Sequence, residues 1–204
     1  SLVLAATGTG SPIGTNATTG RVIVDQTNVT AQANGSVFIT HLGVGDGSGV
    51  HLRNATVEGT LFENKAAGTG STFSFNASQV PSVNDLVVDA ASAVTADNIA
   101  LTSTGGFLFA GTLVPTSSLA LISDNSITSL PAGAIGVPNL VLVTTGAGTT
   151  IGSGAGSPLQ VNTSNLTAQA AGSVWVTDLS GGSVNLISST VDGIPYNNGA
   201  PDNY

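Results

Sequence analysis

The sequence predicts an all-β fold, and more narrowly a parallel, right-handed β-helix solenoid with about 20–25 residues per coil. Three observations lead to this prediction. One alternating pattern occurs three times, charged residues make up only 7% of the chain, and no segment keeps apolar residues at helical spacing. Parallel strands without helices between them indicate a β-helix, because a βαβ fold needs crossover helices.

The repeated pattern is NVTAQANGSVFIT from Asn28, NIALTSTGGFLFA from Asn98 and NLTAQAAGSVWVT from Asn165. Apolar or small residues occupy every second position and a glycine interrupts the run, which is typical of two strands joined by a turn. We expect the apolar parity to form the core and the other parity to face solvent. In the first copy the core parity is Val29, Ala31, Ala33, Val37 and Ile39, and the solvent parity includes Thr30, Gln32 and Thr40.

The segments around this pattern repeat in the same order. The first unit begins with a strand at 2–4, turns at two glycines and continues with a strand at 22–24, and the third unit repeats these features from residue 140. After the pattern, Val50, Leu52, Val57 and Gly59 match Val184, Leu186, Val191 and Gly193. We therefore predict a single β-solenoid domain over residues 1–204, with three related units at approximately 1–83, 84–138 and 139–204.

Neither end of the chain carries the helix or polar repeat that normally closes a solenoid. The N-terminus starts in an apolar strand, and the third unit runs to Gly193 before the tail IPYNNGAPDNY. We expect the uncapped ends to be covered by more protein, either the same chain or a second copy stacked head to tail. Because the start has no initiator methionine and no leader, we expect a processed protein or a segment of a longer one.

The charge and cysteine content exclude several functions. The net charge of −8 provides no basic surface for a phosphate backbone, so we expect no nucleic-acid partner. There is no cysteine, and therefore no disulfide or thiolate metal site. The most apolar run, residues 130–143, contains two prolines and is too short to cross a bilayer, so we expect no membrane insertion.

The run IGSGAGSPLQVNTSNLTAQAAGSVWVTDL, residues 151–179, resembles the repeats of filamentous-haemagglutinin-like bacterial surface adhesins. The resemblance covers most of the chain through its three copies and rests on core and turn positions. It implies a bacterial β-helical rod, extracellular or on the cell surface, used for adhesion or as a scaffold. Together with the uncapped ends, it leads us to expect a structural or adhesive protein that stacks into a filament, a sheath or a longer adhesin rod.

Parallel β-helices also include polysaccharide-cleaving enzymes, which need clustered carboxylates. The middle unit contains Asp85, Asp89, Asp97 and Asp124, but no two of them stand two residues apart on one strand. No GxSxG nucleophile motif is present. We therefore expect no enzyme, and keep a carbohydrate-binding or carbohydrate-cleaving β-helix as the alternative.

The loop GVGDGSG is a candidate metal site. His41 and His51 flank this loop, and Asp46 lies inside it, so the three side chains would form a site if the loop folded back. The third unit replaces His41 by Asp178 and His51 by Asn185, which favours solvated loop residues. We expect no metal and no cofactor.

Two kinds of surface residue remain as candidates for contact. Phe38 and Trp175 occupy the same repeat position on the solvent parity, so their rings either bind a sugar or another protein or are covered by a flanking loop. Asn-X-Ser/Thr tripeptides are the acceptor sequences for N-glycosylation, but turn and strand-surface residues in a chain of low charge are the favoured explanation. They begin at Asn16, Asn28, Asn34, Asn54, Asn76, Asn162 and Asn165.

Overall fold

The computed structural model describes residues 1–42, 49–77, 86–130 and 136–204. Within these ranges the chain consists of strands, turns and loops with no helix, so the all-β prediction is confirmed. The strands are β1 (Leu2–Ala6), β2 (Val22–Val24), β3 (Asn28–Ala33), β4 (Val37–His41), β5 (Val50–Leu52), β6 (Ala55–Val57), β7 (Thr60–Phe62), β8 (Asn64–Ala66), β9 (Thr72–Ala77), β10 (Leu86–Val88), β11 (Ala93–Ser103), β12 (Phe107–Phe109), β13 (Thr112–Ser123), β14 (Asn139–Thr144), β15 (Leu159–Val161), β16 (Asn165–Gln169), β17 (Val176–Asp178), β18 (Asn185–Leu186), β19 (Ser189–Val191) and β20 (Ile194–Tyr196).

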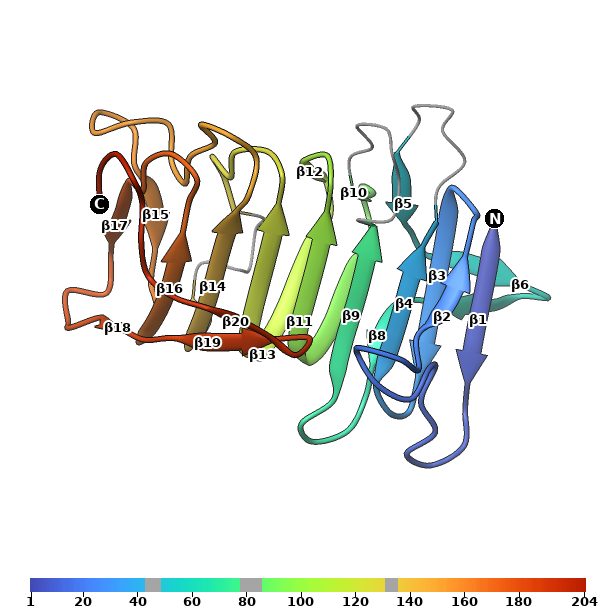
Figure 1. Cartoon of the computed structure of the whole chain (residues 1–204). Helices are drawn as coiled ribbons and strands as arrows, with labels where there is room; N and C mark the ends of the chain where they lie inside the picture. Colours follow the sequence, from blue (N-terminus) through green and yellow to red (C-terminus); the bar gives the residue numbers. More distant parts are fainter. Residues whose placement is uncertain (43–48, 78–85, 131–135) are drawn as a thin grey trace.

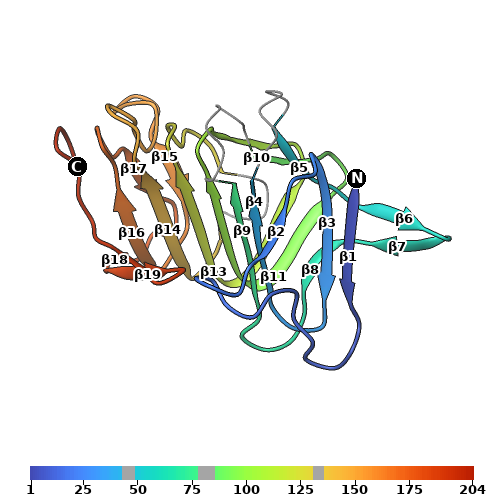
Figure 2. The same cartoon turned by 45° about the vertical axis from the view of Figure 1, so that its right-hand side comes forward.

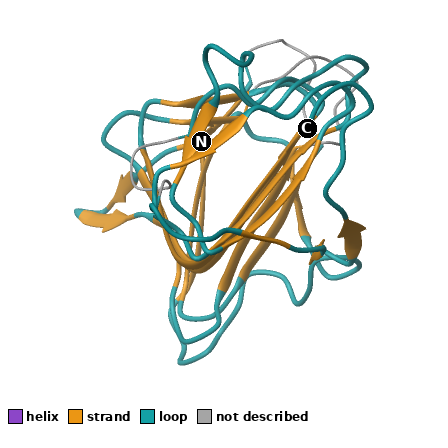
Figure 3. Cartoon of the chain, turned by 90° about the vertical axis from the view of Figure 1, so that its left-hand side faces the viewer, coloured by secondary structure: helices purple, strands orange, loops and turns teal. Residues whose placement is uncertain are grey.

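Fourteen of these strands form one large sheet, and its paired strands are all parallel. They stand side by side in a row from β1 at one end to β16 and β18 at the other (Figure 1). Viewed along the row, the strands lie on the sides of a roughly triangular outline with loops at its corners (Figure 3). The fold is therefore a large parallel sheet without crossover helices.

The register of the sheet gives the length of chain between neighbouring strands. Ile99 pairs with Leu119, Leu119 with Leu140, and Leu140 with Leu166, so successive partners are 20, 21 and 26 residues apart. We call such a row of paired residues a column. The step from β4 to β9 rises to 36 residues because the antiparallel hairpin β6–β7 is inserted between them. These steps are close to the predicted 20–25 residues, with the excess in inserted loops.

The core lies on the apolar parity of the repeated pattern. Val29, Val37, Ile99 and Leu101 are at most 1% exposed and belong to one continuous apolar cluster that follows the sheet. Because every second side chain of a strand points to the same face, the alternating sequence is sufficient to build this core.

Matching segments of the first and third units share several side-chain contacts. Thr30 donates a hydrogen bond to the carbonyl of Arg53 at 2.6 Å, and the matching Thr167 donates to the carbonyl of Ile187 at 2.7 Å. The side-chain oxygens of Asn64 and Asn198 accept hydrogen bonds from the amides of the matching residues Ala31 and Ala168. The repeat is therefore preserved in its polar contacts as well as in its core.

The two units nevertheless occupy different columns. Strand β3 of the first unit pairs with β8, which pairs with the N-terminal half of β11. Strand β16 of the third unit pairs with β14, β14 pairs with β13, and β13 pairs with the C-terminal half of β11. A register shift at Ala96–Asn98 separates the two halves of that strand. Equivalent segments of the two units therefore lie on different sides of the molecule.

The expectation that the second parity faces solvent is wrong at several positions. Thr30 is 1% exposed and Thr40 is 9% exposed, while Gln32 is half-buried. Thr30 is buried because its hydroxyl reaches the chain that leads into a hairpin. On the third unit's side, outward residues form a second apolar cluster, comprising Ala100, Ala120, Ile122, Val141, Val143, Val191 and Tyr196.

The C-terminal tail bonds to the end of the sheet, so the C-terminal end is not as open as the sequence led us to expect. Residues from Ile194 form strand β20 of a hairpin, and the following residues return along β16. The amide of Ala170 donates to the carbonyl of Gly199, and that of Val174 donates to the carbonyl of Asn203. The tail therefore covers part of the strand edge that we expected to be open.

Candidate binding surface

The hairpin β19–β20 lies across the outer face of the large sheet, over β14, β13 and β11 (Figure 1). Val191 and Tyr196 on the hairpin are each 8% exposed, and they pack with Ala100, Ala120 and Val141 on the sheet. The outward residues of these strands are small or β-branched, so the hairpin can approach closely. It thereby extends the third unit over the middle of the chain.

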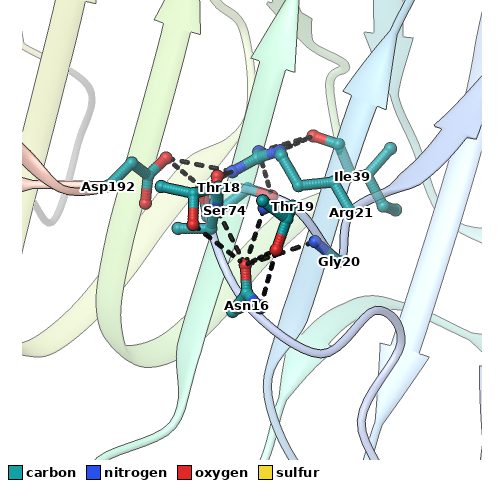
Figure 4. A network of polar contacts seen from close by, with 9 residues as sticks. Asn16, Thr18, Thr19, Gly20, Arg21, Ile39, Ser74 and Asp192 are labelled. Carbon is teal, nitrogen blue, oxygen red and sulfur yellow. Dashed lines mark hydrogen bonds and ion pairs between the residues drawn. The ribbon is translucent and has the colours of Figure 1, made fainter.

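A buried ion pair fixes the tip of this hairpin. Arg21, in the loop before β2, contacts Asp192 at 3.1 Å, and the Ser74 hydroxyl donates to the same carboxylate oxygen at 2.7 Å (Figure 4). Two further guanidinium nitrogens donate to the carbonyl of Ile39 at 3.1 and 2.5 Å. Segments that are 171 residues apart in sequence are joined at this point.

The electrostatics of the pair follow from its burial. The Arg21 side chain is 8% exposed, and this desolvation lowers its pKa, while the charge and hydrogen bond of Asp192 act in the opposite direction. Arginine stays protonated throughout the ordinary pH range, so the guanidinium keeps its charge despite this burial. Burial, followed by the nearby charge of Asp192, raises the pKa of Tyr196.

A groove of about 530 Å³ runs between the hairpin and the sheet. One wall is polar, with Asn98, Ser118 and Asn139 in one column, and the ring of Phe38 contributes to the same lining. The polar wall is part of a ladder, because Ser118 donates to Asn98, Asn165 to Asn139, and Asn185 to Asn165. The groove thus combines amides, hydroxyls and an aromatic ring, a set that matches a polar uncharged ligand.

The structure does not bring Phe38 and Trp175 together. Both are half-buried rather than fully outward, and the backbone and Cβ of each lie beside a glycine of the preceding strand segment, Gly14 and Gly152 respectively. Phe38 lies in the column of Ser74 on β9, whereas Trp175 follows Val174 in the column of Ile151. The two rings are therefore separate candidates, and their role in contact stays a prediction.

The seven predicted glycan acceptors lie in different environments. Asn16, Asn34 and Asn162 are exposed, whereas Asn28, Asn54, Asn76 and Asn165 are half-buried. The amide nitrogen of Asn165 donates to Asn139 within the ladder, that of Asn54 to the carbonyl of Ala91, and that of Asn34 to the carbonyl of Thr7. Glycosylation at any of them stays a prediction, and the three exposed positions are the accessible ones.

The titratable side chains named in the sequence analysis do not form one cluster in the described part of the chain, and Asp85 lies outside that part. His41 is buried with Nε2 3.1 Å from the carbonyl of Gln26, and Asp46 lies outside the described residues. His51 pairs with Asp89 at 2.6 Å, and Arg53 stands 3.8 Å from the same carboxylate. No group of three metal-ligating side chains occurs among the residues that the structure describes. Asp97 and Asp124 bond instead to Thr116 and Thr145.

The buried ion pair and the docked hairpin were missed by sequence reasoning. The signal for the hairpin was present, because TVDGI contains the Asp-Gly dipeptide of a tight two-residue turn between strand residues. The partner Arg21 has no such signal, since the contact depends on how the strands stack.

Comparison with protein-family models, curated proteins and solved structures gave no match. In the described ranges, none of the secondary structure is a helix long and apolar enough to span a membrane.

Proposed function

We propose that this chain is a structural or adhesive module of a bacterial cell surface, built as a right-handed parallel β-helix whose ends stack into a rod or filament. The extracellular location rests on the resemblance to filamentous-haemagglutinin-like adhesins. The composition supports it, because three Lys and Arg residues offer trypsin-like proteases few sites, and the lack of Cys and Met removes oxidation targets.

The observation that carries the stacking is the apolar character of both ends of the parallel sheet. At the N-terminal end, Leu2, Leu4 and Ala6 of β1 are only half-buried, although they pack on the core cluster. In the described ranges β1 pairs with β3 alone, so its other edge carries backbone donors and acceptors for a further strand.

The C-terminal end offers a complementary surface. A groove of about 190 Å³ opens there among core-parity side chains. The tail contributes Tyr204 to this groove and covers only part of the β16 edge. The groove is lined by Val161, Leu166, Val174, Val176, Asp178, Val184, Leu186 and Tyr204. The β1 edge and this groove lie at opposite ends of the row of strands, so a second copy that brings one against the other makes a head-to-tail contact (Figure 1).

Light scattering over a concentration series, with electron microscopy of the same samples, tests this proposal. We expect concentration-dependent growth of rods with the strands across the rod axis. Leu2→Asp places a charge on the half-buried N-terminal edge and should weaken association by about tenfold or more, equivalent to about 1.4 kcal/mol. Leu108→Asp is the matched control, since this side chain is 53% exposed on β12 in the middle of the chain. A monodisperse monomer at every concentration would exclude the proposal.

A carbohydrate-binding role is the second candidate, and the groove beside the docked hairpin favours it. Phe38 lines this groove together with the Asn98 and Asn139 amides, and a sugar ring stacks on an aromatic face while amides bind its hydroxyls. Glycan-array binding that is lost in Phe38→Ser and retained in Trp175→Ser would support this role. Absence of any glycan signal would exclude it.

A further inference from the structure

The chain contains the dipeptide Asn-Gly twice, at Asn34–Gly35 and at Asn198–Gly199. This dipeptide is chemically labile, because the glycine nitrogen can attack the side-chain carbonyl carbon of the asparagine and glycine has no side chain to hinder the attack. Two local properties decide whether a given copy reacts: how firmly the asparagine side chain is held, and whether the glycine N–H is already bonded. The structure gives the two copies opposite surroundings.

The C-terminal copy is held at both residues. The side-chain oxygen of Asn198 accepts hydrogen bonds from the amide of Ala168 at 2.8 Å and from the hydroxyl of Tyr204 at 2.7 Å. The side-chain nitrogen of Asn198 donates to the carbonyl of Ile187 at 2.8 Å. The amide of Gly199 donates to the carbonyl of Ala168 at 3.0 Å. The attacking nitrogen is therefore bonded, and the side chain cannot turn toward it without losing its own hydrogen bonds.

The N-terminal copy is far less restrained. Asn34 is exposed at the corner that follows β3, and its side-chain nitrogen donates to the carbonyl of Thr7 at 2.6 Å. The amide of Gly35 makes no hydrogen bond to any residue that the structure describes. The equivalent Gly172 of the third unit follows an alanine, and its amide donates to the carbonyl of Thr149 at 2.8 Å. The labile dipeptide thus occupies the copy of this corner in which the glycine nitrogen is unpaired.

Water, which the reaction also requires, has access to this corner. Asn34 and Gly35 line an open groove of about 500 Å³. Most of the other residues along this groove are glycine, serine or threonine of neighbouring corners, so no large apolar side chain covers the dipeptide except at the Phe38 end. The site therefore has an exposed amide, an unpaired attacking nitrogen and solvent.

We propose that Asn34 is a site of spontaneous deamidation. The Gly35 nitrogen forms a bond to Cγ of Asn34 and gives up its proton, while the side-chain nitrogen of Asn34 leaves as ammonia. The product is a cyclic succinimide, which water opens at either carbonyl to give aspartate or isoaspartate. The net reaction consumes water and releases ammonia, with no oxidation or reduction. This proposal does not depend on the stacking of chains.

The reaction changes how the first two coils are joined. Strands β1 and β3 lie side by side at the N-terminal end of the row (Figures 1 and 2). Asn34 joins their ends, since its backbone amide donates to the carbonyl of Ala6 at 3.0 Å and its side chain donates to Thr7. A carboxylate has no hydrogen to donate, so the aspartate product places a negative oxygen against the Thr7 carbonyl.

The isoaspartate product has a second effect, because it adds a carbon to the main chain beside Gly35. The backbone is closely packed there, since an added Cβ on Gly35 would lie 2.6 Å from the carbonyl oxygen of Gly10. Both products therefore weaken the contact between β1 and β3, and the effect is confined to the N-terminal corner.

Peptide mapping by mass spectrometry, after incubation of the folded chain at mildly alkaline pH, tests the site. Asn34 should deamidate at least about tenfold faster than Asn198, because Asn198 reacts only after local opening breaks the hydrogen bond of Gly199. In urea, where this protection is lost, the two asparagines should react at similar rates. A ratio of rates that is the same in the folded and unfolded chain would overturn the proposal.

Three variants of Asn34 separate the reaction from its consequence. Asn34→Gln keeps the amide but needs a larger ring to react, and Asn34→Ala has the residue of the third unit, so both should abolish the fast reaction. Asn34→Asp reproduces one product and should melt about 2–4 °C below wild type, since it loses one hydrogen bond. Incubation should lower the melting temperature of wild type but not of Asn34→Gln. If Asn34→Asp melts with wild type, the effect on the β1–β3 contact is overturned.

Discussion

Removal of the Asp192 carboxylate is the strongest test of the docked hairpin. In Asp192→Ala, the Arg21 guanidinium, which is 8% exposed, loses its ion-pair partner, and the Ser74 hydroxyl loses its acceptor. Breaking a buried ion pair by removing one partner costs about 3–5 kcal/mol. The carbonyl of Ile39 still accepts from Arg21, and the Asp192 side chain is 18% exposed, so we expect the lower end, about 3 kcal/mol.

Guanidinium chloride denaturation followed by far-UV circular dichroism measures this loss. For a chain of this length, about 3 kcal/mol corresponds to a fall in melting temperature of about 6–12 °C. Asp192→Ala combined with Arg21→Met removes both charges, and this variant should be more stable than Asp192→Ala alone because no buried charge is left unpaired. A loss below about 1 kcal/mol in the single variant, or a double variant no more stable than the single one, would refute the reasoning.

Three further predictions follow from other parts of the structure. Gly152→Ala should lower the free energy of unfolding by about 3 kcal/mol, because φ is +79° and an added Cβ would lie 2.2 Å from the carbonyl oxygen of Trp175. Gly148 has a similar φ of +73° but open space around it, so Gly148→Ala should cost only about 1 kcal/mol. Thermal unfolding of the two variants compares these losses. Tyr196 has a raised pKa in the folded state, so the stability it contributes is present below pH 10 and lost as pH rises through the folded pKa; Tyr196→Phe should lose less stability in alkaline denaturation. Hydrogen bonds from a threonine hydroxyl and a backbone amide lower the pKa of Asp97 from 3.8. The stability that this carboxylate contributes is therefore present above that value and lost as pH falls through the folded pKa. An NMR titration should place the pKa of this carboxyl below 3.8, and a value at or above 3.8 would contradict the two bonds.

The sequence was sufficient to predict the elements that depend on local periodicity. Alternation around Val29, Ile99 and Leu166 predicts strands with one buried face, and the matching glycines predict the turns between them. The equivalence of the first and third units was also visible, because core positions and turn residues repeat together. These features depend on side-chain period and backbone conformation, which neighbouring residues determine.

The parts that could not be predicted depend on stacking between distant segments. Thr30 and Ala100 stand on the outward parity, and only the path of a hairpin decides that they are buried. Arg21 meets Asp192 because the third unit lies over strands of the first and middle units, a relation that periodicity does not encode. The rings of Phe38 and Trp175 share a repeat position, yet they lie in different columns because inserted loops shift the register of the repeat against the sheet.

This shift of the repeat decides which sides of the molecule carry its hairpins and aromatic rings. Asn28 and Asn165 open equivalent segments 137 residues apart, but these segments lie on different sides of the molecule. If each unit kept the same side, all of its hairpins and rings would form a single line along the chain, and lateral contacts could occur in one direction only. A chain extended by duplication of such a unit instead distributes them around its circumference. The same short sequence then presents its hairpins and rings in several directions.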